Sequence, residues 1–461
     1  MAEHSVTVEN TLQALLSEKK YTTIRDILIT MNPADVAAVF SGCEPEQLPL
    51  LFRLLPKEQA AESFVEMESD QQETLIRGLS DSELRQVMDE LYVDDAVDIV
   101  EEMPANVVQR ILAQSDPQMR KEINEILQYP ENSAGSVMTT EYVSLSPKMT
   151  VGDAILRIRR TGVDKETIYT CYVLDNRLLV GTVSVKSLLL APSDMQTIDT
   201  VMETGSGLIT VNTHTDQEEV AQMMSKYNLL AIPVVDGDNR MVGIVTFDDA
   251  MDVMEDETTE DMEIMAGMTP SDKTYLRSTP FDLFRHRIPW LALLMISATF
   301  TGLIITGFEA KLQSMVALTA FIPMLMDTGG NSGSQSSVTV IRAISLGELE
   351  FRDLPKAIWK EIRTAVLCGI ALAGLCFAKI MIVDHLLLRT EGVTALVALV
   401  VCLTMAVTVL IAKIVGCTLP LLAKKLGFDP AVMASPFITT IVDALSLLIY
   451  FGISSTMLNL V

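Results

Sequence analysis

The N-terminal part of the chain has a hydrophobic pattern that recurs at every twelfth position between residues 45 and 115. Within each unit the apolar positions are spaced i, i+1 and i+4, which places them on one face of a helix. Twelve residues allow about two helical turns and a connection, so two units form one helical hairpin. Such short helices bury their apolar faces only by stacking, and the pattern therefore predicts an all-α superhelical domain over residues 1–130. The repeated apolar positions are Phe52, Phe64, Ile76, Met88, Val100 and Leu112; Leu55, Met67, Leu79, Leu91 and Met103; and Leu75, Val87, Ile99 and Ile111.

The pattern leaves two roles open for this superhelix. It is either a plain helical solenoid or a domain that docks or senses a ligand. Acidic side chains gathered in one repeat favour sensing, with Asp94, Asp95 and Asp98 next to Glu101 and Glu102.

Over residues 131–250 the pattern changes to short β-rich runs that alternate with amphipathic helices. Two β-rich pairs are each divided by a polar turn, and a short extended piece and a helix precede each pair. We therefore expect two copies of one α+β unit, packed side by side. The first copy comprises Tyr142–Leu145, Val151–Arg160, Thr170–Leu174 and Leu179–Val183; the second comprises Gly207–Val211, Gln217–Tyr227, Leu230–Val235 and Met241–Val245.

Residues 281–461 contain long apolar segments, and two of these stretches, Ile288–Phe308 and Gly392–Ala412, lack any charged side chain. Each is as long as a helix that crosses the hydrocarbon core, so we expect an all-α polytopic membrane domain. With the N-terminal domains in the cytoplasm, most basic residues between the segments lie inside, and the C-terminus lies outside. The five predicted transmembrane helices are Ile288–Phe308, Leu312–Ile341, Thr364–Val383, Gly392–Leu422 and Ala431–Leu460.

Charge is distributed as unevenly as hydropathy. Beyond residue 280 there are 11 acids and 13 bases, whereas the part of the chain up to residue 280 holds 49 acids and 21 bases, a net charge of −28. So acidic a region repels the phosphates of nucleic acids and attracts cations. The six cysteines are scattered and the N-terminus resembles no signal peptide, so we expect reducing cytosol around these domains and neither disulfides nor a zinc site. The membrane segments exclude a purely soluble enzyme, and we expect a protein of the cell (plasma or inner) membrane.

The segment Asp248–Glu263 carries nine carboxylates and no Lys or Arg. These charges repel one another unless cations intervene. Interleaved Met and Val residues leave a partial apolar stripe, so we predict an amphipathic helix in a connecting region over residues 251–280. Divalent cations are its natural partners because hard ions prefer oxygen ligands, and a solvated acidic linker is the alternative. The acids are Asp248, Asp249, Asp252, Glu255, Asp256, Glu257, Glu260, Asp261 and Glu263.

Polar residues mark two of the membrane segments. The second segment contains Asp-Thr-Gly-Gly-Asn-Ser-Gly-Ser-Gln, where Gly329 and Gly333 have the G-x-x-x-G spacing of closely packed helices. Packing does not explain Asn331 and Gln335, which together with glycine carbonyls make a polar wall for a hydrated cation. Asp443 is the one charge in the fifth segment, where a carboxylate costs about 2.5–3.5 kcal/mol, so it should face a wet cavity. Since Mg2+ sheds water reluctantly, we expect Asp443 to bind the ion's water shell.

The two α+β units resemble a tandem CBS pair, through Ala231–Val235 followed by Gly243-Ile244-Val245-Thr246-x-x-Asp249. In CBS domains such an Asp holds a nucleotide ribose, so the resemblance implies at most one ATP site, with Asp249, Thr246 and Pro233 as its residues. The first copy has Ser187 in place of the acid, and Leu229 stands where some members have an adenine-stacking aromatic, so an empty cleft is the alternative.

The whole chain resembles the MgtE family of magnesium channels. The matching pieces are the superhelix, the CBS pair, the acidic helix, the P-x-x-x-D-T-G-G-N-x-G-x-Q segment and the T-T-x-x-D helix. The resemblance implies a homodimeric, Mg2+-selective pore that cytosolic Mg2+ closes, and so a role in magnesium homeostasis. By this resemblance the pore residues are Asp443, Gly329, Gly330, Asn331 and Gln335; the Mg2+-binding acids are Asp249, Asp252, Glu257, Glu260 and Asp261, with Asp95, Asp98, Asp216 and Asp429 as partners.

Two rival functions from other classes remain. One is a proton-coupled or alternating-access carrier of another divalent cation or solute, in which Asp443 titrates. The other is a membrane-anchored nucleotide sensor that transports nothing. None of these functions is enzymatic.

Overall fold

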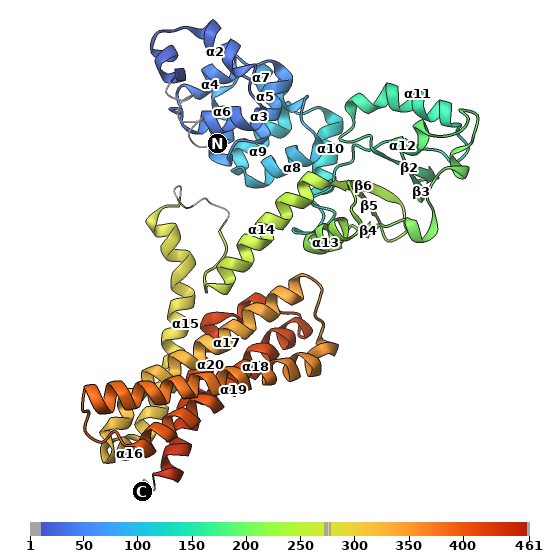
Figure 1. The fold of residues 1–461 in the computed structure, drawn as a ribbon. Helices are drawn as coiled ribbons and strands as arrows, with labels where there is room; N and C mark the ends of the chain where they lie inside the picture. The colour runs from blue at the N-terminus through green and yellow to red at the C-terminus, as the bar shows by residue number, and fades with distance from the viewer. Residues whose placement is uncertain (1–10, 272–274, 276–277, 459–461) are drawn as a thin grey trace. The chain divides into compact units, whose positions relative to one another are not determined.

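The computed structural model describes residues 11–271, 275 and 278–458. The chain divides into two compact units, Met1–Met254 and Glu255–Val461. The boundary falls inside one long helix, α14 (Phe247–Met265), which occupies the place of the predicted acidic helix (Figure 1). The predicted connecting region over residues 251–280 lies partly outside the described residues.

The repeat of the N-terminal part forms an all-α superhelix, as predicted. From α4 to α9 each unit of the repeat contributes one short helix, and the apolar columns point inward: Phe64, Ile76 and Met88 are fully buried. The helices of this domain are α2 (Tyr21–Leu28), α3 (Pro33–Ser41), α4 (Leu48–Phe52), α5 (Lys57–Val65), α6 (Ser69–Gly78), α7 (Asp81–Met88), α8 (Val93–Glu102), α9 (Ala105–Gln114) and α10 (Pro117–Ile126).

Local capping signals explain why the helices begin where they do. Ser80 caps α7 through its hydroxyl, which accepts from the Glu83 amide, and Glu83 Oε2 accepts from the Ser80 amide at 2.7 Å. This reciprocal capping box satisfies two amides that no helical carbonyl reaches. Arg53 also binds Glu83, at 2.7 Å, and with the Ser80 amide it lowers the pKa of Glu83 to about 2.

The two α+β units have the same topology. In each, a short strand pairs in parallel with the next strand, which pairs antiparallel with the third. Two predicted elements are shorter than expected: within Tyr142–Leu145 only Ser144–Leu145 is a strand, and within Gly207–Val211 only Val211 belongs to one, because Gly205–Gly207 forms a 3-10 turn. The elements are β1 (Ser144–Leu145), α11 (Val151–Thr161), β2 (Thr170–Asp175), β3 (Leu178–Ser184), α12 (Val185–Leu189), β4 (Val211–Asn212), α13 (Gln217–Tyr227), β5 (Ala231–Val235) and β6 (Met241–Thr246).

The second α+β unit shares its hydrophobic core with the superhelix. Ile232, Val234 and Val245 from its sheet belong to the same buried cluster as the repeat helices, and so do Ala250 and Val253 at the start of α14. This shared core holds the first turns of α14 in place next to the superhelix. The first α+β unit has a core of its own around α11.

In the membrane domain the described residues contain four helices long and apolar enough to cross a bilayer: Pro280–Gly307, Phe351–Leu387, Ala395–Lys425 and Pro430–Met457. They match four of the five predicted segments. The remaining one, Leu312–Ile341, is not a single helix, since a 3-10 turn at Val316–Phe321 divides it. Its main part, α17 (24 residues), is long enough but too polar to qualify by hydropathy. The fifth predicted segment ends at Leu460, outside the described residues. The helices are α15 (Pro280–Gly307), α16 (Glu309–Ser314), α17 (Ile322–Ser345), α18 (Leu354–Lys379, continued by a π-helical turn Ile380–Leu387), α19 (Ala395–Lys425) and α20 (Ser435–Met457).

Helix α19 is the centre of this domain and packs against α17, α18 and α20 (Figure 1). It approaches α17 closely, and a Cβ added to Gly416 would stand 2.2 Å from the Gly333 carbonyl oxygen. Glycines therefore let the two backbones touch.

Candidate ion-binding sites

A cavity of about 470 Å3 opens between the first turns of α17 and the middle of α20. It combines carboxylate, amide and hydroxyl groups with apolar side chains, and such polar groups are rare and costly inside a membrane domain. The lining residues are Ile322, Pro323, Met326, Asp327, Gly330, Asn331, Thr439 and Asp443.

Three of the five predicted pore residues, Asp443, Asn331 and Gly330, line this cavity, and Gly329 and Gln335 do not. A Cβ on Gly329 would stand 2.7 Å from Thr408 Cγ2 and 2.8 Å from Ser446 Oγ, so this glycine serves the packing of α17 against α19 and α20. The packing explanation of the glycine-rich stretch therefore holds for Gly329, whereas Gly330 lines the cavity.

Asp327 is the cavity residue that sequence analysis missed. Asn331 Nδ2 donates a hydrogen bond to Asp327 Oδ1 at 3.0 Å, and both side chains line the cavity with Asp443. The available signal was the i, i+4 spacing of Asp327 and Asn331, which puts the two on one helical face.

A second group of acids lies where α8 meets the start of α14. Asp95, Asp98 and Asp249 lie close enough here for their charges to influence one another. Burial and the nearby carboxylates of Asp249 and Asp248 raise the pKa of Asp95 to about 7. Asp98 reaches solvent at the rim, and partial burial with the charges of Asp249 and Asp95 raises its pKa to about 7. In this compact arrangement the acids therefore favour protons or other cations as partners.

Asp249 also has a local structural role. Its carboxylate accepts hydrogen bonds from the Thr246 hydroxyl and, at 3.3 Å, from the Thr246 amide, so it caps the N-terminus of α14. Burial nevertheless raises its pKa to about 6.

Three further acids belong to the same region: Asp94, which the sequence pattern had indicated, and Glu141 and Glu166, which it had not. Asp94 is 7% exposed, and burial with the Asp249 charge raises its pKa well above the usual value. Burial raises the pKa of Glu141 to about 7, and burial with the Asp95 charge raises that of Glu166 to about 8. One carboxylate oxygen of each glutamate is buried without a hydrogen-bond partner among the described atoms. The group is thus larger than the sequence indicated.

The other predicted Mg2+ ligands are more dispersed. Asp216 is exposed and caps α13 by accepting from the Glu218 amide at 2.9 Å. Asp252, Glu257 and Glu260 lie on α14, and so does Asp261, which accepts from Ser345 Oγ at 3.4 Å. Burial and the charge of Asp429 raise the pKa of Asp261. Within the described part of the chain, no three His, Cys, Asp or Glu side chains converge closely enough to hold a metal ion together.

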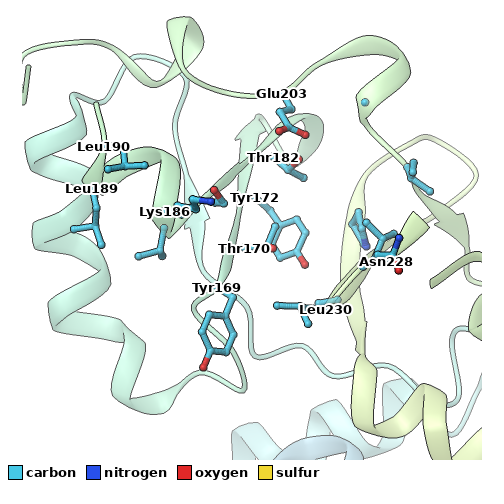
Figure 2. A pocket seen from close by; sticks show the side chains of 17 residues that line it. Tyr169, Thr170, Tyr172, Thr182, Lys186, Leu189, Leu190, Glu203, Asn228 and Leu230 are labelled. Atoms are coloured by element: carbon cyan, nitrogen blue, oxygen red, sulfur yellow. The ribbon is translucent and has the colours of Figure 1, made fainter. Parts of the chain in front are cut away.

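A second cavity, of about 700 Å3, lies between the two α+β units (Figure 2). It takes Lys186 from α12 and Pro233 from β5, and in Figure 2 Tyr172 lies between Lys186 and Asn228. Of the three predicted nucleotide-binding residues only Pro233 lines this cavity, and Thr246 and Asp249 lie outside it. In the first unit the position that corresponds to Asp249 is occupied by Ser187. Its amide donates to Ser184 Oγ at 3.0 Å.

These features together define a polytopic membrane transport protein with an acidic helical domain and a paired α+β module outside the membrane. Comparison with known families agrees: residues 31–132 match the MgtE intracellular N domain, residues 134–194 and 199–256 match CBS domains, and residues 322–453 match MgtE, described as a divalent cation transporter. The chain belongs to the MgtE family. It is therefore a multi-pass membrane protein with an intracellular N domain, and a transporter rather than an enzyme.

Similar proteins extend over nearly the whole chain. The magnesium transporter MgtE of Thermus thermophilus is 34% identical over 456 residues, 98% of both chains, and that of Bacillus subtilis is 32% identical over 96% of both. Among solved structures, the cytosolic domain of the Mg2+ channel MgtE in complex with ATP matches 53% of this chain and 99% of its own, with 35% identity and a TM-score of 0.50. The soluble part of a magnesium transporter matches 55% and 99%, with 28% identity and a TM-score of 0.50.

Proposed function

We propose that this chain is a Mg2+-selective channel for magnesium uptake that closes when cytosolic Mg2+ rises. The observation that carries the proposal is the cavity lined by Asp327, Asn331 and Asp443. Six waters of about 30 Å3 each surround a hydrated Mg2+, so the volume of about 470 Å3 accommodates the ion with its water shell. The membrane potential alone favours entry of a divalent cation by ~4.6 kcal/mol per 100 mV, so uptake needs no coupled reaction.

The gating part of the proposal rests on the acidic groups of the cytosolic region. At low Mg2+ the carboxylates of α8 and α14 repel one another and favour separated domains. At high Mg2+ the ions bridge them and favour the compact state, which then holds α14 over a closed pore. Mg2+ commonly uses one or two protein carboxylates and keeps several waters, so pairs of acids suffice. The proposed ligands are Asp95, Asp98, Asp216, Asp249, Asp252, Glu257, Glu260, Asp261 and Asp429.

The proposed assembly is a homodimer in the cell membrane, with the C-terminus outside. A two-fold axis next to α17 and α20 would bring two Asp443 side chains to one pore. Five transmembrane helices, with α17 as the polar one, put the two ends of the chain on opposite sides.

Reconstituted liposomes test the pore. Mg2+ current that disappears in Asp443→Asn and persists in Glu391→Gln, a matched change in the exposed loop before α19, supports a channel. Electroneutral uptake would instead favour a carrier, and nucleotide binding without any flux would favour a sensor.

A separate variant tests the gate. It replaces Asp249, Asp252, Glu257, Glu260 and Asp261 by the corresponding amides. If millimolar internal Mg2+ closes this variant as it closes the original protein, the feedback mechanism is wrong.

We also propose that the cavity between the α+β units binds ATP. Lys186 provides a cation for phosphate, and the related cytosolic domain crystallised with ATP supports the assignment. Titration with ATP should show binding that is weakened in Lys186→Ala and retained in Lys226→Ala, an exposed lysine outside the cavity. Equal affinities for both variants would reject this site.

A further inference from the structure

The C-terminal end of α14 is joined to the membrane domain through Gly267. This residue has a φ of +74°, and the amides of Gly267 and Met268 donate to the carbonyls of Ile264 and Glu263, both at 2.9 Å. A glycine in the left-handed conformation is a common helix ending, because other residues are strained there. The chain therefore leaves α14 in a fixed direction.

Trp290 on α15 lies directly against this glycine. A Cβ added to Gly267 would stand 2.4 Å from Trp290 Cδ1, 2.5 Å from Trp290 Nε1 and 3.1 Å from Pro436 Cγ. No side chain fits between the backbone and the indole ring. The end of α14 thus packs on α15 and on the first turn of α20 at one point.

His286 holds the same segment one helical turn earlier on α15. The Thr269 amide donates to the His286 carbonyl at 2.9 Å, and His286 Nδ1 lies 3.1 Å from the Thr269 carbonyl. A carbonyl only accepts, so Nδ1 carries the proton of the second bond. These two bonds orient the chain that follows Gly267 along α15.

A tryptophan near a membrane surface often serves as an interfacial anchor whose N–H reaches water or lipid headgroups. Trp290 Nε1 is instead buried and has no acceptor among the described atoms. The indole is therefore held for its contact with Gly267, at the cost of a hydrogen bond.

We propose that Gly267, Trp290 and His286 form a rigid joint that passes movements of α14 to α15 and α20. This inference rests on the proposed gating function. Asp443 follows Pro436 by seven residues on α20, about 10 Å along the helix. A shift of α14 is thereby transmitted toward the cavity instead of being absorbed in the connection, and Trp290 is a positioning residue for the gate.

The first test measures Mg2+ flux into liposomes at low and high internal Mg2+ for the full-length protein. Gly267→Ala and Trp290→Ala should leave the Mg2+ flux unchanged at low internal Mg2+. Both should raise the internal Mg2+ concentration that inhibits the flux by half, by about tenfold. Gly347→Ala is the matched control, because Gly347 has a φ of +67° and nothing within 4 Å of its added Cβ. Unchanged half-inhibition in both joint variants, or an equal shift in Gly347→Ala, overturns the joint. Absence of inhibition in the unaltered protein instead overturns the gating function itself.

A second measurement follows the joint directly. The chain has two tryptophans, Trp290 and Trp359, so Trp359→Phe leaves Trp290 as the single indole. A rigid joint predicts the same emission maximum with and without Mg2+, and a red shift in Gly267→Ala. A red shift on removal of Mg2+ from the Trp359→Phe protein would show that the joint opens, and would reject rigid transmission.

Discussion

The side-chain amide of Asn331 donates to the Asp327 carboxylate across 3.0 Å, one helical turn apart on α17. This bond uses one N–H of the amide and leaves the Asn331 oxygen as an acceptor. Asp327, Asn331 and Asp443 thus all have acceptor oxygens in the lining of the cavity. A hydrated cation presents only O–H donors, so this arrangement is complementary to it.

Asp327→Asn should reduce the Mg2+ current more at low external Mg2+ than at saturating external Mg2+. One unit charge about 6 Å from a divalent ion contributes about 1.4 kcal/mol even at the dielectric constant of water, or about tenfold in affinity. We therefore expect the external Mg2+ for half-maximal current to rise about tenfold in electrical recordings. Glu391→Gln is the control, and equal concentration dependence in the two variants would remove Asp327 from the ion site.

The acidic group on α8 and α14 should make stability depend on pH. Its pKa values in the folded protein, about 7 for Asp95 and Asp98, lie above the ordinary 3.8. The folded state thus binds more protons than the unfolded state between these values, so stability falls as pH rises from about 4 to 7. Without Mg2+, the melting temperature of the cytosolic unit in the full-length protein should fall over this range, and millimolar Mg2+ should restore it.

Two variants check that these residues cause the effect. The double variant Asp95→Asn/Asp98→Asn should reduce the pH dependence, because neutral amides need neither protons nor cations. Asp89→Asn changes an exposed acid at the end of α7 and should leave the pH dependence of stability unchanged. If the double variant retains the full slope, other acids are responsible.

Periodic features explain how much could be predicted from the sequence. Phe64, Ile76 and Met88 recur at every twelfth position, and each is fully buried in the superhelix. The spacing of apolar residues in such a repeat identifies both the helix and the face of it that is buried, so both can be predicted directly from the sequence. Helix α13 likewise has the predicted bounds, Gln217–Tyr227.

Sites made by segments distant in sequence were harder to predict. Asp249 fits a nucleotide motif, but the fold turns its carboxylate to Thr246 and the acids of α8, away from the cavity that contains Pro233. Gln335 shares a helix with Asn331, but the cavity does not extend to it. In both cases the sequence showed the chemical character of the side chain. It did not show which helix or strand would pack next to that side chain and so supply its partners.

Gly416→Ala should destabilise the membrane domain. The new Cβ would stand 2.2 Å from the Gly333 carbonyl oxygen, which is backbone and cannot rotate away. Separating α17 from α19 costs about 1–3 kcal/mol, as overpacking does elsewhere. The fraction of monodisperse protein after heating in detergent should fall, whereas Gly374→Ala on α18, with nothing within 4 Å of its added Cβ, should behave like the original protein. Similar losses in both variants would mean that the contact is not limiting.

The last prediction concerns Lys413 on α19 and Glu361 on α18. Their side chains are only 6% and 15% exposed, and Lys413 Nζ lies 3.7 Å from Glu361 Oε2. Removing one partner leaves a buried charge, which typically costs about 3–5 kcal/mol, whereas replacing both by apolar residues is often neutral. Lys413→Met should therefore destabilise the domain, and Lys413→Met/Glu361→Met should recover most of the loss.

Recovery in the double variant is the decisive measurement, because it separates an ion pair from simple packing. The bond from Ser336 Oγ to the Lys413 carbonyl, at 3.2 Å, involves the main chain and survives both changes. Lys424→Met, at an exposed site on the same helix, controls for the loss of a basic residue. If the double variant is less stable than Lys413→Met alone, Glu361 does not act through Lys413, and α18 is held to α19 by apolar contacts alone.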